Sequence, residues 1–310
     1  MSKVIIVKKE YKGWKNCISM SNDFIELIAT TDVGPRIISL SFHNDKNVFC
    51  EFKEFLGTTG GDEWKIYGGH RLWHSPESKP RTYEPDNSKI SWRKKKNSIV
   101  LTQPVEPWTQ IQKEMEIHLS PDSPRVTVTH RLTNKGAWTV ELALWALSVM
   151  APGGKEIIPQ ITKDTGLLPN RSLSLWPYTK MNDPRIYWGE KYIFVSQSQN
   201  ADTPLKIGLP NEDGWAGYIN GKNMFLLQYT HVDGVSYPDY GSSYETYTND
   251  RMLEMETLTP LVLLDTNDTI EHTEVWTLYK DVPMVETEQD VEKYVVPLIK
   301  PALENGLSKK

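Results

Sequence analysis

The sequence has few cysteines and no hydrophobic run long enough to cross a membrane. Cys17 and Cys50 are its two cysteines and no Cys-x-x-Cys occurs, so neither a disulfide framework nor a thiolate zinc site is expected. Nothing approaches the roughly 18 consecutive apolar residues of a membrane span. The N-terminal stretch MSKVIIVKKEYKGW also lacks the apolar core of a signal peptide. We therefore expect a cytoplasmic protein without a membrane partner.

An excess of positive charge is also missing. The chain has 35 Lys and Arg against 40 Asp and Glu, for a formal net charge of −5. Proteins that bind nucleic acids carry a basic surface, so this balance argues against a nucleic-acid partner.

Phenylalanine is scarce relative to the other aromatic residues, with 7 Phe against 11 Trp and 14 Tyr. Trp and Tyr carry a polar group and are favoured where a packed surface meets a polar ligand. Two explanations stay open: the aromatics fill the core of a large β-sandwich, or they stack on the flat C–H faces of sugar rings.

Helical periodicity is absent from most of the chain. Short runs rich in β-branched and aromatic residues recur about every ten residues, and many alternate as half-buried antiparallel strands do. Examples are FIELIATT, RIISLSF, IQKEMEIHL, RVTVTHRL, VELALWALSVM and MLEMETL. With no helices between them, a parallel α/β fold is excluded. We predict an all-β fold of antiparallel sheets, in one domain over residues 1–310.

The tail is the exception. Val291, Val295 and Ile299 recur with helical spacing, and Thr287 can cap the helix. This predicts a C-terminal helix over about 286–300, with Pro297 expected to kink or end it.

The long connection at residues 57–89 contains the stretch GGHRLWHSPE, in which His70, Arg71, Trp73, His74 and Glu77 follow a glycine pair. Paired glycines let the backbone approach a ligand. Three interpretations remain: a metal site of His70, His74 and Glu77, a polar recognition loop in which Arg71 donates to sugar oxygens and Trp73 stacks, or a loop held by structural hydrogen bonds.

The stretch MLEMETL places Glu254 and Glu256 on one face of a strand. If the preceding TNDR closes a tight hairpin, Glu245 lies opposite Glu254 and Ser243 opposite Glu256. Like charges across a strand pair are destabilising, so three carboxylates on one face need cations, a shared proton or a ligand. Such a cluster can raise a glutamate pKa towards that of a general base. An exposed, salt-bridged face is the alternative.

A second long connection, residues 151–190, contains LPNRSLSLWPY. Arg171 beside Trp176 predicts a sugar platform, and a loop packed by its own aromatic residues is the alternative. Arg36, Arg71 and Arg171 are the cations expected near the carboxylates.

The run YETYTNDRMLEMETLTP resembles the galactose mutarotase (aldose 1-epimerase) pattern of Tyr-Thr-Gly-Asn followed by a strand with Leu-Glu-Thr-Gln and then Pro. The resemblance implies that Glu256 is the general base. It implies that Arg71 binds the sugar, and Asp239 is the position assigned to the family's substrate-binding aspartate.

One departure from that family concerns the general acid. Mutarotases carry it in a mid-chain His-Pro-Tyr-Phe motif, and the comparable strand here reads ALWALSVMAPGG. Trp145 cannot donate a proton in acid catalysis, so the acid would come from His70 or His74.

The wider chain, with GGHRLWHSPE, PNRSLSLWPY and HTEVW, is similar over nearly its whole length to an uncharacterised family of the mutarotase-like superfamily, DUF4380. This similarity implies a β-supersandwich whose concave face binds carbohydrate.

These observations lead to one hypothesis and two alternatives. The hypothesis is a mutarotase-like isomerase that opens the ring of a free sugar or sugar derivative by acid–base catalysis, with Glu256 as base, His70 or His74 as acid and no cofactor. Its substrate-binding residues would be Arg71, Trp73, Glu245, Glu254, Asp239, Arg171 and Trp176. The alternatives are a non-catalytic carbohydrate-binding protein on the same fold and a metal-dependent sugar isomerase.

Overall fold

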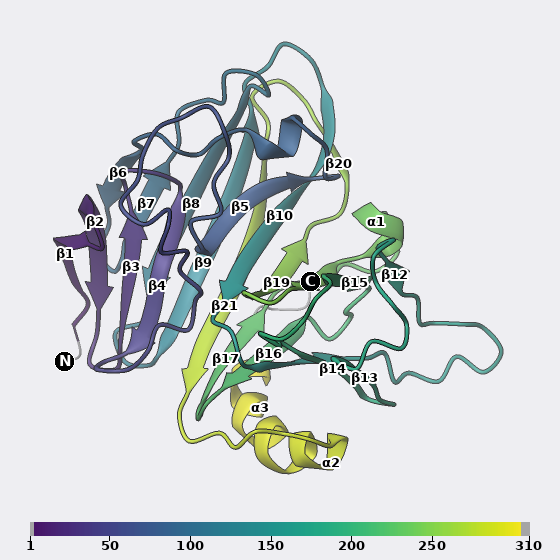
Figure 1. The fold of residues 1–310 in the computed structure, drawn as a ribbon. Coiled ribbons are helices and arrows are strands. Elements are labelled where there is room, and N and C mark those ends of the chain that lie inside the picture. The colour runs from purple at the N-terminus through teal and green to yellow at the C-terminus, as the bar shows by residue number, and fades with distance from the viewer. Residues whose placement is uncertain (1–2, 305–310) are drawn as a thin grey trace.

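Two large antiparallel sheets pack face to face in the computed structural model, which describes residues 3–304 (Figure 1). All pairings between neighbouring strands are antiparallel. The prediction of an all-β fold of antiparallel sheets is confirmed.

The first sheet carries the candidate site described below. Its strands follow the spatial order β1 (Ile5–Tyr11), β2 (Trp14–Ser21), β3 (Ile25–Thr30), β4 (Arg36–Phe42), β5 (Gly69–Ser75), β10 (Val140–Met150), β19 (Leu253–Leu258), β18 (Tyr244–Thr248), β15 (Leu205–Leu209) and β12 (Ser174–Leu175). An eleventh strand, β20 (Val262–Leu264), pairs with the start of β10.

The second sheet has ten strands. Their order is β13 (Ile186–Trp188), β14 (Tyr192–Ser196), β11 (Lys155–Pro159), β16 (Trp215–Asn220), β17 (Asn223–Gln228), β21 (Thr269–Tyr279), β9 (Arg125–Asn134), β8 (Ile111–Leu119), β7 (Ser98–Thr102) and β6 (Ser91–Lys94). Two short helices lie in connections, η1 (Arg81–Tyr83) and α1 (Pro238–Gly241).

The main core lies between the sheets, and the strand sequences explain how it forms. In β8, Ile111, Met115 and Ile117 point into the core while Glu114 and Glu116 stay partly exposed, as period-two alternation requires.

The central strand β10 differs because it is buried on both faces. Leu144 and Ala146 belong to the main core, whereas Trp145 and Leu147 belong to a small cluster on the outer face. The outer face of the first sheet is therefore covered as well, and the candidate site lies there.

The predicted C-terminal helix is present, in three consecutive pieces: α2 (Glu288–Asp290), the π-helix η2 (Val291–Val295) and α3 (Val296–Glu304). Thr287 caps it through a capping box with Asp290. The helix does not end at Pro297, and α3 continues to Glu304, beyond the predicted bound of about 300. A wide π turn directly precedes Pro297 and accommodates a residue that has no N–H donor.

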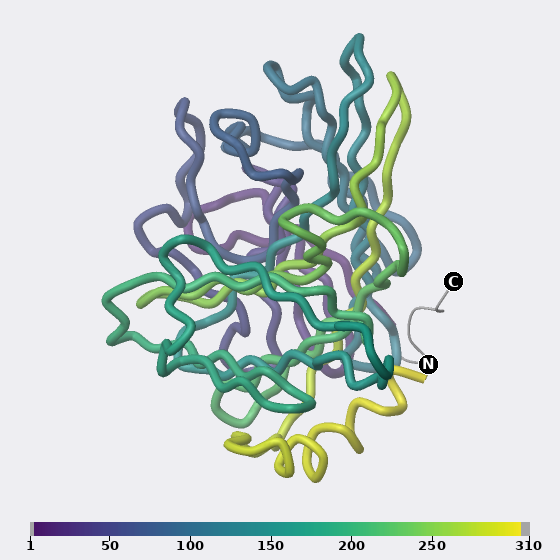
Figure 2. Tube along the Cα trace, turned by 90° about the vertical axis from the view of Figure 1, so that its right-hand side faces the viewer, coloured from purple at the N-terminus to yellow at the C-terminus, as the bar shows by residue number. Residues whose placement is uncertain are grey.

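The apolar stripe of this helix packs on the outer face of the second sheet. Val291, Val295 and Ile299 form a cluster with residues of β11, β14, β16 and β17 that include Phe194 and Trp215. Figure 2 shows the helical segment below the strands.

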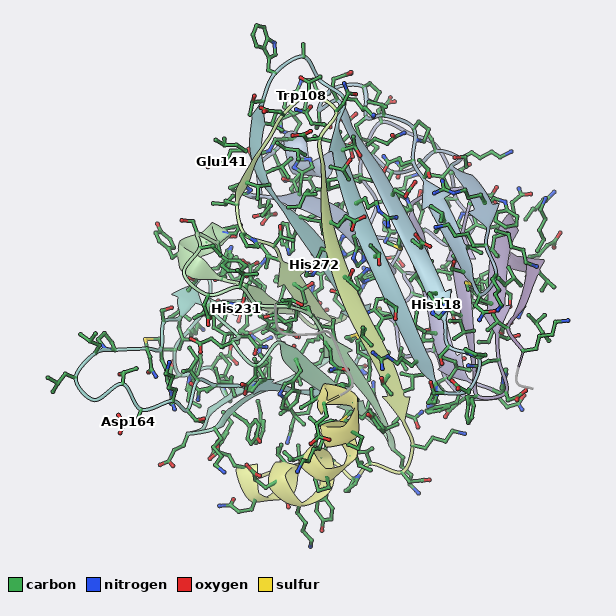
Figure 3. All side chains as sticks on the ribbon, turned by 180° about the vertical axis from the view of Figure 1, so that it is seen from behind. Trp108, His118, Glu141, Asp164, His231 and His272 are labelled. Carbon is green, nitrogen blue, oxygen red and sulfur yellow. The ribbon has the colours of Figure 1, made fainter. Side chains whose placement is uncertain are left out.

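The long connections are only partly irregular. The stretch expected to be a loop at 69–75 is strand β5, which pairs with β4 and β10. Residues 160–173 do form a projecting loop between β11 and β12, and Asp164 lies on this loop (Figure 3).

We predict that the helix stripe contributes substantially to stability. Ile299→Ala removes a fully buried side chain and should lower the free energy of unfolding by about 2–5 kcal/mol, measured by urea titration. The control is Leu298→Ala, one position earlier in the same helix, where the side chain is 41% exposed. Equal losses from the two substitutions would contradict the packing described here.

Candidate functional site

A cavity of about 390 Å³ opens on the outer face of the first sheet. This volume lies within the usual range for small-molecule sites. Most of its wall is aromatic or charged. The lining residues are Trp64, Ile66, Arg71, Trp73, Glu77, Tyr83, Trp145, Leu147, Trp176, Tyr178, Pro204, Lys206, Tyr247, Glu254 and Glu256.

Strand register explains why these side chains meet. Arg71 pairs with Leu147, Leu147 with Glu256, and Glu256 with Glu245, so these residues form one row across β5, β10, β19 and β18. Residues in such a row point to the same face of the sheet. Residues two positions along each strand extend the same face.

Glu256 is held in the cavity wall by two donors. The indole Nε1 of Trp145 donates to its Oε2 over 2.9 Å, and the Lys206 ammonium donates to the same oxygen over 2.9 Å. The other oxygen, Oε1, is buried and has no hydrogen-bond partner among the described residues. A buried, unpaired carboxylate oxygen is costly, which favours a function for this group over a purely structural role.

Lys206 connects the carboxylates. Its Nζ lies 2.8 Å from Glu245 Oε2 and 2.9 Å from Glu256 Oε2. The ammonium also lies over the rings of Trp145 and Trp176, 4.5 Å and 4.6 Å from their centroids. A cation between two aromatic faces is stabilised by their quadrupoles, which lowers the cost of its burial.

The pKa values of these three side chains are set by one buried cation that lies beside two buried carboxylates. Burial raises the pKa of Glu256 to about 7, with Lys206 acting in the opposite direction. Burial also raises the pKa of Glu245 well above its usual value. For Lys206 burial acts against the charge, but Glu245 and Glu256 together hold its pKa above the normal range. The ammonium of Lys206 therefore stays charged. Glu245 and Glu256, which share this one cation, take up a proton more readily than ordinary glutamates do.

Arg71 and Glu254 form a second ion pair in the wall, with Nη1 and Oε1 2.7 Å apart. The guanidinium lies 4.4 Å from the ring centroid of Trp73 and 5.2 Å from that of Trp64. Arg71 Nε and Trp64 Nε1 are buried donors without a partner among the described residues.

The aromatic side chains form a continuous wall around Trp73. Its ring centroid lies 4.9 Å from that of Trp64, 5.0 Å from that of Tyr83 and 5.5 Å from that of Trp145. The Tyr83 hydroxyl donates to Glu77 at the exposed edge. Together with the ion pairs, this wall presents flat apolar faces beside charged hydrogen-bonding groups.

The predicted hairpin register is shifted by two residues. Glu245 pairs with Glu256, and Tyr247 pairs with Glu254. The turn is longer than expected because Asn249 Oδ1 accepts from the backbone of Arg251 and Met252 and closes a four-residue loop. An even shift keeps all three carboxylates on one face, so they do gather as expected, and they are buried instead of forming an exposed face.

His70 and His74 do not line the cavity, which corrects the expectation that they lie beside the sugar. Because residues 69–75 form a strand, both imidazoles point to the face opposite Arg71 and Trp73. His74 Nε2 lies 4.0 Å from Glu106, and burial lowers the His74 pKa to about 3. The alternative metal set of His70, His74 and Glu77 does not come together in the described structure, since Glu77 lies in the cavity wall on the other face of the sheet.

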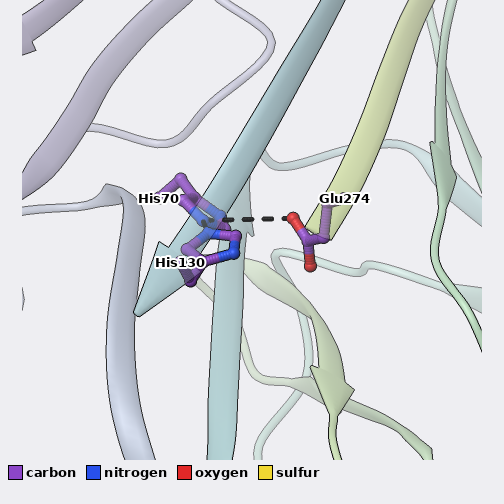
Figure 4. Close-up of side chains that lie close together, drawn as sticks. All are labelled: His70, His130 and Glu274. Carbon is purple, nitrogen blue, oxygen red and sulfur yellow. Dashed lines mark hydrogen bonds and ion pairs between the residues drawn. The ribbon is translucent and has the colours of Figure 1, made fainter. Parts of the chain in front are cut away.

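His70 belongs to a buried polar cluster between the sheets (Figure 4). Its Nε2 lies 2.7 Å from His130 Nε2 and 3.9 Å from Glu274 Oε2. Within residues 3–304 these three are the one group whose donor atoms are close enough to share a metal ion, all within 4.8 Å. The outer nitrogens are also paired: His70 Nδ1 with Ser148 at 2.9 Å, and His130 Nδ1 donating to the His272 carbonyl at 3.1 Å. The two imidazoles thus satisfy each other as a hydrogen-bonded pair.

The remaining expected site residues divide between the cavity and its surroundings. Trp176 lines the cavity, and Glu245 lies buried behind Lys206. Arg171 lies on the projecting loop and donates to the carbonyls of Ile161 and Glu190, away from the cavity. Asp239 lies in α1, where its carbonyl accepts from Ser174 and Ser242, and it does not line the cavity. Arg36 pairs with Asp86.

Sequence reasoning missed Lys206. In the stretch PLKIGL it looks like an ordinary solvent-facing lysine of an edge strand, because Leu205 and Ile207 alternate with it. The one signal was indirect: three carboxylates on a neighbouring face require a cation. The expected cations were arginines, and Arg71 alone among them reaches the carboxylates.

Comparison with known proteins shows which solved structures share this fold. No family model and no curated protein matches the sequence. A galactose mutarotase-like protein from Lactobacillus casei superposes with a TM-score of 0.55 at 11% identity, over 85% of this chain and all of that one. A galactose mutarotase-like protein from Clostridium acetobutylicum gives 0.52 at 13% identity, over 90% of this chain and all of that one. A TPR-domain containing protein from Parabacteroides distasonis gives 0.55 at 14% identity, over 87% of this chain and 48% of that one.

The chain therefore has a galactose mutarotase-like β-sandwich fold with a C-terminal helix, as the sequence resemblance implied. It spans about half the length of the TPR-domain protein. In the described part of the chain, none of the helices is long and apolar enough to span a membrane.

We predict that the buried histidines make the protein sensitive to acid. Burial lowers the pKa of His130 to about 3, so between its unfolded pKa of about 6.5 and that value the unfolded chain binds a proton that the native state does not. Stability should fall as the pH decreases through this window, by up to about 1.4 kcal/mol per pH unit for this group.

Urea titrations between about pH 7 and pH 4.5 test this for the wild type, His130→Gln and His118→Gln. His130→Gln should flatten the dependence of the unfolding free energy on pH. The control His118 lies on β8 (Figure 3) with its side chain exposed, and its substitution should leave the slope unchanged. Parallel curves for the wild type and His130→Gln would contradict this account.

Proposed function

We propose that the protein binds a free sugar or sugar derivative in this cavity and interconverts its anomers by opening the ring, with Glu256 as the general base. The observation that carries the proposal is the setting of Glu256. Its carboxylate lies in the wall of an aromatic cavity, with one oxygen held by two donors and the other without a hydrogen-bond partner in the described part of the chain.

The raised pKa of Glu256 suits this role. A base that removes the proton of an anomeric hydroxyl works best when its pKa lies near the working pH. Burial supplies that shift, while Lys206 keeps the carboxylate ionised for part of the time.

The other wall residues would position the sugar. Arg71 and Glu254 offer donors and acceptors to its hydroxyls, and their mutual ion pair fixes both side chains before the ligand arrives. Trp73 and Trp176 would stack on the C–H faces of the ring. The galactose mutarotase-like fold is compatible with a carbohydrate ligand, and a fold alone does not fix an activity.

A second candidate is a carbohydrate-binding protein without catalysis. Among residues 3–304 no histidine lines the cavity, so the imidazole acid that mutarotases use has no counterpart here. Trp145 Nε1 donates to Glu256 and cannot act as an acid.

We predict that Glu256→Gln abolishes anomer interconversion. Freshly dissolved α-aldohexoses are mixed with the protein and their equilibration is followed by NMR. The wild type should accelerate it, and the variant should lose roughly 10²- to 10⁴-fold in kcat. Glutamine keeps the size of the side chain and an acceptor oxygen, so the sugar should still raise the melting temperature.

Glu114→Gln, on the outer face of the second sheet, is the matched control and should retain full activity. Sugar-induced stabilisation of a wild type that does not accelerate equilibration would select the binding protein. Neither stabilisation nor acceleration, with a broad panel of sugars, would refute both candidates.

We also predict an unusual pH profile. Because the base must be ionised, kcat/KM should fall as the pH decreases below about 7, the raised pKa of Glu256. An unperturbed glutamate would place this loss near pH 4.3. A profile that stays flat down to about pH 5 would exclude Glu256 as the base.

A further inference from the structure

Opening a sugar ring needs a proton donor as well as a base, because the ring oxygen leaves with a negative charge that must be neutralised. The protic groups in the cavity wall, apart from the indoles and Arg71, are Lys206 and the phenols of Tyr83, Tyr178 and Tyr247. Tyr83 already donates to Glu77, and burial raises the pKa values of Tyr178 and Tyr247. Lys206 alone among these groups contacts the proposed base.

We infer that Lys206 is the proton donor to the ring oxygen, acting as a pair with Glu256. The inference rests on the proposed function. Of the three N–H groups of the ammonium, one donates to Glu256 over 2.9 Å, and a second is assigned to Glu245, whose Oε2 lies 2.8 Å from Nζ. The third remains for a ligand, since Lys206 lines the cavity and its other close neighbours are the faces of Trp145 and Trp176.

The step balances in protons and electrons. Glu256 takes the proton of the anomeric hydroxyl, and the electrons of that O–H bond form the carbonyl double bond. The bond between the anomeric carbon and the ring oxygen breaks, and its electrons remain on the ring oxygen. That oxygen takes a proton from Lys206 Nζ. The products are the open-chain aldehyde, a neutral amine at Lys206 and a neutral carboxylic acid at Glu256, and the net charge of the cavity is unchanged.

Ring closure on the other face of the carbonyl reverses the transfers and gives the other anomer. Lys206 recovers its proton from the hydroxyl that becomes the ring oxygen, and Glu256 returns its proton to the anomeric oxygen. Because Nζ and Oε2 are 2.9 Å apart, the pair can also exchange a proton directly, without solvent.

The contact between Lys206 and Glu256 also explains how a strongly stabilised ammonium can release its proton during the reaction. At rest Lys206 holds its proton tightly, because two carboxylates stabilise the ammonium. When Glu256 accepts the anomeric proton it becomes neutral, and one of these two stabilising charges disappears. Lys206 then becomes a stronger acid at the moment when the ring oxygen needs the proton.

Three variants test the assignment in the NMR assay with freshly dissolved α-aldohexoses. Lys206→Arg keeps the positive charge but gives up its proton far less readily, and Lys206→Ala removes the donor. Both should lose roughly 10²- to 10⁴-fold in kcat. Adding methylammonium should restore part of the activity of Lys206→Ala, which a merely structural role would not allow. Glu245→Gln removes one stabilising carboxylate and should move the alkaline limb of the kcat profile to lower pH.

The outcomes separate this inference from the proposed function. A wild type that accelerates equilibration while Lys206→Arg keeps its kcat would overturn the role of Lys206 and leave the role of Glu256 intact. So would the loss of kcat in Tyr178→Phe together with full activity in Lys206→Arg. If Lys206→Ala binds sugar, judged by its thermal shift, and methylammonium restores nothing, the proton donor is not Lys206. A wild type without any acceleration would refute the proposed reaction itself.

Discussion

The ion cluster of Lys206, Glu245 and Glu256 is the constraint on which the cavity depends. Glu245 and Glu256 face each other directly across β18 and β19, both buried, and like charges in such a pair oppose strand pairing. One ammonium from β15 lies within 2.9 Å of both. It can do so because the sheet order places β15 next to β18 and β18 next to β19. Removing this cation would leave two buried carboxylates uncompensated, so the topology of this end of the sheet and the chemistry of the cavity are linked.

The same sheet separates two polar systems that have different roles. On the outer face, Arg71 and Glu256 line a cavity, and each has a polar atom with no hydrogen-bond partner among residues 3–304. On the inner face, His70 and His130 bond to each other, and Glu274 accepts from Thr257 and Trp276 at 2.5 and 2.8 Å. A cluster that is satisfied internally stabilises a specific packing of the two sheets, whereas unpaired groups beside a cavity are available to a ligand.

Much of the fold could be predicted from sequence, because alternation and turn spacing are local properties. The stretch MLEMETL placed Glu254 and Glu256 on one face correctly, since period two holds for any strand.

The side on which His70 and His74 lie could not be predicted, because it depended on whether residues 69–75 are strand or loop. Lys206 was missed for a related reason: its burial comes from the strands and loops packed around β15, and nothing in PLKIGL encodes those neighbours. The predicted hairpin register was wrong because the Asn249 side chain accepts hydrogen bonds from the backbone of Arg251 and Met252, which makes the turn longer than a two-residue turn.

In the proposed reaction the two oxygens of Glu256 have different tasks, which explains how an ion-paired carboxylate could accept a proton. Trp145 and Lys206 both donate to Oε2, so this oxygen fixes the orientation of the carboxylate. Oε1 has no hydrogen-bond partner within residues 3–304, so it is the oxygen that would take the proton in the proposed reaction without breaking either bond. A base that had to release Lys206 before reacting would lose the stabilisation of a buried ion pair at that moment. Because the pair stays in place, proton acceptance by Glu256 and proton release by Lys206 can be coupled at one site.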